Sequence, residues 1–125
     1  MEYPQLKGLP ECPLITPVIK VEHERVNLGG VWHSDTTYLG RPPMASMLYA
    51  VEIPPYGGDT VFANQYLADY LFEHQVRPEF TCRFRWQRGS LAFWDNRCTQ
   101  HNPVNDYHGF KRVMHRVTLA GDAPY

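Results

Sequence analysis

Proline and glycine divide this chain into short segments, and this division constrains its fold more than any other feature. The two residue types occupy 11 and 9 of the 125 positions. Proline cannot donate a backbone hydrogen bond, and glycine weakens the interior of helices and strands. The segments between them are rich in β-branched and aromatic residues, which favours short strands joined by turns over a helical bundle. We therefore predict a mainly β chain with minor helices.

Seven segments have the composition of strands and are expected to pair into sheets. They span residues 18–26, 31–38, 46–53, 60–63, 80–86, 91–94 and 111–120. Residues 64–74 have the apolar spacing of a short amphipathic helix. A turn that contains Gly29 and Gly30 precedes the second strand and allows the backbone to approach a neighbour closely.

The charge and the cysteine content argue against several classes of partner. A formal net charge of -1 and a pI near 6.6 give no reason to expect nucleic acid or an anionic membrane surface. Cys12, Cys82 and Cys98 form no C-x-x-C pair, so neither a disulfide framework nor a thiolate zinc site is indicated. The N-terminus lacks the apolar run of a signal peptide, and no stretch reaches membrane-spanning length. We therefore expect a cytoplasmic protein that acts on a small molecule.

One motif in this β framework can bind a metal ion. In an extended segment alternate side chains share a face, so His33, Asp35 and Thr37 are expected to point the same way. A distant second imidazole, that of His101, can complete a set of three ligands. Two histidines and one carboxylate with open positions are typical of mononuclear non-haem iron sites. A His-x-Asp motif is short enough to occur by chance, so its surroundings must decide.

The last predicted strand carries two arginines at alternate positions. Arg112, Met114 and Arg116 fall on one face, and His115 falls on the other. Two arginines directed into the interior would need an anionic ligand to compensate their charge. An outward face with two solvated arginines is the more common arrangement. Both alternatives are open at this point.

Other polar and aromatic residues near these positions are expected to have structural roles. Asp59 follows two glycines and is expected to cap a turn rather than to bind metal. Asn96 and Arg97 either orient His101 or stabilise a turn. Solvated histidines are expected at His23, His74 and His108, and core aromatic side chains at Trp32, Phe93 and Trp94.

Two blocks of the sequence resemble a known family. WHSDTTYLGRPPMASMLYAVEIPPYGGDTVFAN, residues 32–64, and GSLAFWDNRCTQHNPVNDYHGFKRVMHRVTLAGDAPY, residues 89–125, are similar to the taurine dioxygenase (TauD/TfdA-like) family. Members of this family are Fe(II)- and 2-oxoglutarate-dependent dioxygenases built on a double-stranded β-helix, a cupin-like jelly roll. The resemblance implies this fold, an iron cofactor and 2-oxoglutarate as co-substrate.

The resemblance also implies roles for individual residues. It assigns His33, Asp35 and His101 to the catalytic iron-binding triad. Arg112 matches the arginine that holds the distal carboxylate of 2-oxoglutarate, and Thr60 matches a hydroxyl that assists it. Arg116 matches a second arginine, near the co-substrate and the anionic end of the substrate in sulfonate-using members. The implied reaction is hydroxylation of an aliphatic carbon of a small anionic substrate by dioxygen, with release of succinate and carbon dioxide.

The chain departs from the family in its length. The spacing between Asp35 and His101 is much shorter than relatives show. Near residues 68–69 the family-like sequence passes directly to a segment that lies far downstream in relatives. We expect a single oxygenase domain over residues 1–125, composed of ordered parts joined across that gap and lacking an N-terminal region. An intact mass near 14.5 kDa would instead show that the short form exists.

Two other functions fit parts of the pattern. A non-catalytic cupin-like module could use the same barrel to hold a metal or an anion without turnover. A zinc hydrolase could use His33, Asp35 and His101, but no additional base is evident and the paired arginines would be unexplained. The substrate and the oligomeric state stay open, and a homo-oligomer is compatible with the sequence.

Overall fold

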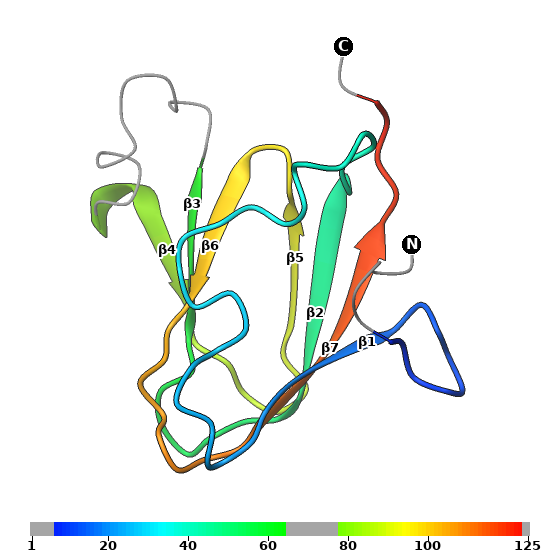
Figure 1. The fold of residues 1–125 in the computed structure, drawn as a ribbon. Coiled ribbons are helices and arrows are strands. Elements are labelled where there is room, and N and C mark those ends of the chain that lie inside the picture. The colour runs from blue at the N-terminus through cyan, green and yellow to red at the C-terminus, as the bar shows by residue number, and fades with distance from the viewer. Residues whose placement is uncertain (1–6, 65–77, 124–125) are drawn as a thin grey trace.

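The computed structural model describes residues 7–64 and 78–123, which form two antiparallel sheets (Figure 1). One sheet has the strand order β1-β7-β2-β5 and the other has the order β4-β3-β6. The strands are β1 Thr16–Lys20, β2 Ala45–Glu52, β3 Thr60–Asn64, β4 Thr81–Phe84, β5 Leu91–Asp95, β6 Thr99–Pro103 and β7 Arg112–Leu119. A short 3-10 helix, η1 Pro78–Phe80, precedes β4. The prediction of a mainly β chain is confirmed.

Strand β7 lies inside the larger sheet, between β1 and β2. Its residues alternate between fully and partly buried, and Arg112, Met114 and Arg116 occupy buried positions. His115 is on the opposite face, as expected. The arginines therefore point into the interior, and the solvated alternative is wrong because a central strand of this sheet turns that face toward the other sheet.

The core is formed by apolar side chains of both sheets. Trp94 of β5 packs against Phe62 of β3 with 5.3 Å between ring centroids, and Leu48 and Met114 extend the same cluster. Phe93 was predicted to be a core residue, but it is 61% exposed. Alternation along β5 directs Trp94 inward and its neighbour outward, so only one of the two aromatic residues is buried.

Four of the predicted strands, residues 46–53, 60–63, 91–94 and 111–120, match observed strands to within one residue at each end. The strand predicted over residues 31–38 is wrong. His33 forms one isolated bridge there, and the backbone then turns through Thr36, which has a positive φ of 45°. Strand β6 was missed because its polar sequence, TQHNP, has no alternation of apolar residues. The helix predicted over residues 64–74 and the discontinuity near residues 68–69 lie outside the described residues, except that Asn64 ends β3.

The segment between β1 and β2 crosses the space between the two sheets (Figure 1). It is attached to the smaller sheet by its bridge to β6, where Ser34 Oγ also donates a hydrogen bond to the Thr99 carbonyl at 3.0 Å. Within the described ranges, no helix has the length and apolar character needed to cross a membrane.

Candidate metal centre

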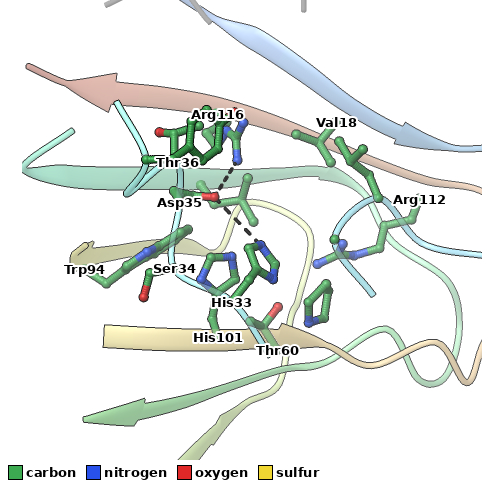
Figure 2. A pocket seen from close by; sticks show the side chains of 15 residues that line it. Val18, His33, Ser34, Asp35, Thr36, Thr60, Trp94, His101, Arg112 and Arg116 are labelled. Carbon is green, nitrogen blue, oxygen red and sulfur yellow. Dashed lines mark hydrogen bonds and ion pairs between the residues drawn. The ribbon is translucent and has the colours of Figure 1, made fainter. Parts of the chain in front are cut away.

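Three side chains of the predicted triad converge at the bridge between His33 and His101. The two backbones exchange hydrogen bonds, with N···O distances of 3.1 and 2.9 Å. The imidazole rings lie 4.2 Å apart, and Asp35 lies beside them (Figure 2). One ligand atom from each of the three residues can be chosen so that all lie within 4.8 Å of one another. These are the donor types of a mononuclear non-haem iron site.

The ring of His33 is held in one orientation. Its Nδ1 lies 2.7 Å from the Val31 carbonyl oxygen, so Nδ1 donates to that oxygen, and the lone pair of the neutral ring is on Nε2. Nε2 is 3.8 Å from Asp35 Oδ1. Gly29 has a φ of +69°, and a Cβ there would lie 2.6 Å from His33 Cε1. The backbone of this turn therefore approaches a neighbour closely, as predicted, and that neighbour is the imidazole of His33.

The carboxylate of Asp35 is buried and held at both oxygens. Ser46 Oγ donates to Oδ2 at 3.0 Å and accepts a hydrogen bond from Asn96 Nδ2 at 2.9 Å. Arg116 Nη1 donates to Oδ1 at 3.2 Å, on the side that faces His33. Asp35 is 3% exposed, Ser46 is 0% exposed and Asn96 is 1% exposed, so this relay is shielded from water. Sequence reasoning missed Ser46, because an isolated serine in a strand carries no signal.

The structure shows which contacts Asn96, Arg97 and Asp59 make. Asn96 acts on Asp35 through Ser46 rather than directly on His101. Arg97 Nε donates to Asp95 Oδ1 at 2.9 Å, so it stabilises the turn after β5. Asp59 accepts a hydrogen bond from Arg83 Nε at 2.7 Å and stays outside the cluster of ligand atoms.

His101 is suited to bind a metal because it is neutral at pH 7. Burial lowers its pKa to about 4; the Asp35 charge opposes this shift, and the charges of His33 and Arg116 add to it. Its Nδ1 is buried and has no hydrogen-bond partner in the part of the chain that the structure describes. A neutral imidazole, an orphaned buried nitrogen and an adjacent carboxylate fit a divalent transition metal.

Thr60 and Arg112 both contact Trp86. Trp86 Nε1 donates to Thr60 Oγ1 at 2.9 Å, which leaves the hydroxyl proton of Thr60 available to another acceptor. The guanidinium carbon of Arg112 lies 5.7 Å from the Trp86 ring centroid. Arg112 is 6% exposed, and its Nε and Nη2 have no partner among the described residues. Burial lowers its pKa, yet an arginine stays charged, so the site presents unused donors to an anion.

The triad, Thr60 and both arginines line one cavity of about 440 Å³. Arg116 lies beside Asp35, and Arg112 lies on another side of the triad, beyond His33 (Figure 2). The remaining wall is mainly apolar and includes Val18, Leu28, Tyr38, Leu48 and Trp94. A mostly apolar pocket with a few converging polar groups is typical of a small-molecule site.

Comparison with known proteins identifies the family. The sequence model described as "Taurine catabolism dioxygenase TauD, TfdA family" matches residues 17–68 and 65–118. The chain belongs to this family. The two matched stretches meet within residues 65–68, which lie outside the described part of the structure.

Individual TauD/TfdA relatives match parts of the chain. An alkylsulfatase from Acinetobacter baylyi is 51% identical over 59 residues, which are 47% of this chain and 19% of that protein. An alpha-ketoglutarate-dependent sulfate ester dioxygenase from Pseudomonas putida is 46% identical over 67 residues, 54% of this chain and 22% of that protein. The chain thus spans about a fifth of the length of these curated relatives.

A solved structure of the family confirms the predicted fold. The crystal structure of a taurine dioxygenase from Burkholderia xenovorans superposes with a TM-score of 0.76 and 28% sequence identity. The match covers 92% of this chain and 67% of that chain. The two antiparallel sheets are therefore those of the double-stranded β-helix expected from the resemblance.

Proposed function

We propose that this chain carries the active site of an Fe(II)- and 2-oxoglutarate-dependent dioxygenase that hydroxylates an aliphatic carbon of a small anionic substrate. One observation carries the proposal: a His-Asp-His cluster that can hold a metal ion shares a pocket with a buried arginine, Arg112, whose Nε and Nη2 have no partner among the described residues. Membership of the TauD/TfdA family supports it. A zinc hydrolase would need no such arginine.

In this proposal His33, Asp35 and His101 hold the iron. His33 offers Nε2, because its Nδ1 is tied to the Val31 carbonyl, and Asp35 offers Oδ1, the oxygen that lies 3.8 Å from His33 Nε2. Two neutral imidazoles and one carboxylate leave ligand positions free for other groups. Bound Fe(II) would supply the activation of dioxygen, coupled to conversion of 2-oxoglutarate into succinate and carbon dioxide.

Arg112 and Thr60 bind the distal carboxylate of 2-oxoglutarate. The planar guanidinium can donate two parallel hydrogen bonds, and the Thr60 hydroxyl, oriented by Trp86, can donate one more. Arg112 lies beyond His33 and Thr60 lies next to His33 (Figure 2), so a carboxylate bound by these two residues would leave the keto-acid end of the molecule directed toward the triad. The chain thus orients the co-substrate at both ends.

Arg116 is proposed to receive the anionic group of the substrate. It lies beside Asp35, on another side of the triad from Arg112, while apolar side chains such as Leu28, Leu48 and Trp94 suit an alkyl portion. Two of the similar proteins are named for sulfate esters. We therefore propose a sulfate ester or a sulfonate as the substrate class.

The decisive assay is succinate formation in the presence of Fe(II), 2-oxoglutarate, dioxygen and candidate alkyl sulfates or taurine. The proposal predicts succinate from the wild-type chain and none from His33→Ala or Asp35→Ala variants. Lys111→Met serves as a control, since Lys111 pairs with Glu52 outside the pocket. Tight binding of metal and 2-oxoglutarate without any succinate, coupled or uncoupled, would support a non-catalytic cupin-like module instead.

We also propose that residues 1–125 belong to one oxygenase domain in which a segment found in relatives is absent near residues 68–69. The match of the family's sequence model in two stretches supports this. A cytoplasmic location remains our inference from the three unpaired cysteines.

A further inference from the structure

Lys20 is a buried cation whose charge has no hydrogen-bonding partner. The residue is 4% exposed, and its Nζ has no acceptor among the described residues. The ammonium instead lies over the ring face of Tyr107, whose centroid is 4.3 Å from Nζ. A buried ammonium without an acceptor opposes folding, so such a group usually serves a ligand or a partner.

Lys20 lies directly beside Arg112. The two residues are paired Cα partners in neighbouring strands β1 and β7, which run side by side in Figure 1. Both occupy buried positions, so both side chains are on the interior face of the sheet. Within the described ranges neither forms an ion pair, and the nearby carboxylate of Asp59 is already bonded to Arg83. This end of the interior therefore carries two positive charges that no carboxylate pairs with directly.

Tyr107 connects the two cations. Its ring is below the Lys20 ammonium, and its phenol interacts with the Arg112 guanidinium. The phenol donates a hydrogen bond to Asn27 Oδ1 at 2.7 Å, and the Asn27 amide donates to the carbonyls of Pro103 and Val104. Tyr107 is 1% exposed, so its position is fixed by packing as well. Lys20 itself is not among the residues that line the cavity, whereas its strand partner Arg112 is.

We propose that Lys20 is a positioning residue for the co-substrate. Its charge raises the positive potential at the end of the pocket where Arg112 binds a carboxylate, and the arriving dianion compensates both cations. This inference rests on the proposed function, because it needs 2-oxoglutarate to bind at Arg112. It also explains why a costly buried ammonium is kept in a strand whose other inward residues, Thr16 and Val18, are uncharged.

The test compares Lys20→Met, Lys20→Arg and Lys111→Met by calorimetric titration of the Mn(II)-loaded chain with 2-oxoglutarate. Methionine keeps most of the side-chain volume of Lys20 and removes its charge, while Lys111→Met removes a charge that is partly exposed and paired with Glu52. We expect the dissociation constant of 2-oxoglutarate to rise about tenfold in Lys20→Met, and to stay near the wild-type value in the other two variants. Mn(II) affinity should be unchanged in all three variants.

Thermal unfolding of the metal-free variants separates this role from a structural one. Because the ammonium opposes folding, Lys20→Met should unfold at the wild-type temperature or higher. A clearly lower unfolding temperature for Lys20→Met, with 2-oxoglutarate affinity equal to wild type, would overturn the inference in favour of a structural role. Equal affinity with unchanged stability would overturn it as well. Absence of 2-oxoglutarate binding by the wild-type chain would instead refute the proposed function, and the inference with it.

Discussion

The hydrogen-bond relay behind Asp35 can be tested by a single substitution, Ser46→Ala. The serine hydroxyl donates to Asp35 Oδ2 at 3.0 Å and accepts from Asn96 Nδ2 at 2.9 Å. Removing the hydroxyl therefore breaks both bonds at once. The carboxylate then keeps the hydrogen bond from Arg116 to Oδ1, the oxygen that we propose binds the metal.

The expected loss of stability follows from these contacts. A hydrogen bond to a charged carboxylate contributes about 1.5–3 kcal/mol, and a buried amide left without an acceptor costs about 1–3 kcal/mol. Ser46 and Asn96 are both essentially inaccessible to water, at 0% and 1% exposure, so solvent cannot replace the lost bonds. Allowing for partial relaxation, we expect the free energy of unfolding to fall by about 3 kcal/mol.

The same substitution should weaken metal binding. Residues that orient a ligand typically contribute about 10- to 100-fold in metal affinity when they are removed. Urea unfolding of the metal-free chain measures the loss of stability, and titration with Mn(II) measures the loss of metal affinity. Ser90→Ala is a matched control, because the Ser90 hydroxyl accepts one hydrogen bond in an exposed turn.

Each of the two measurements can refute the reasoning. Wild-type stability in Ser46→Ala would show that the relay does not contribute to folding. Reduced stability with unchanged Mn(II) affinity would show that Asp35 is oriented without Ser46, and that Arg116 and packing suffice.

Three further predictions concern the other groups of the site. Gly29→Ala should reduce Mn(II) affinity more than tenfold, because the added Cβ would clash with His33. Gly109→Ala is the control, since Gly109 also has a positive φ but has open space around it; this variant should lose only stability, about 1–2 kcal/mol in urea unfolding. Arg112→Lys should weaken 2-oxoglutarate binding about 10- to 100-fold in calorimetry and leave Mn(II) affinity unchanged, because a point charge replaces the planar fork. Since the pKa of His101 is lowered to about 4, the metal-free chain should be most stable above pH 6.5 and lose up to about 3 kcal/mol as pH falls to 4. His101→Gln should remove most of that loss in urea unfolding measured across this range.

The alternation of residue types predicted the strands whose two faces differ. Arg112, Met114 and Arg116 alternate with Val113, His115 and Val117, and β7 has the expected faces. Strand β6 could not be found this way, since its polar sequence is made a strand by pairing with β3. The strand predicted over residues 31–38 failed because local β propensity did not account for the turn at Thr36.

Part of the site could be predicted because its residue types are chemically distinctive. Histidine, aspartate and arginine are residue types that bind metals and carboxylates. The sequence around His33, Asp35, His101 and Arg112 also resembles that of the family. The supporting residues carried no such signal. Ser46, Trp86 and Lys20 are ordinary strand or loop residues until their partners are known.

The sequence by itself determined the chemistry that this protein can carry and the β character of its backbone, because donor types and alternation are properties of neighbouring residues. The tertiary structure decided which groups meet. His33 and His101 are joined by a bridge between distant segments, and the facing sheets decide that both arginines of β7 point inward. These contacts depend on strand pairing and register across the whole chain, which local sequence patterns do not encode.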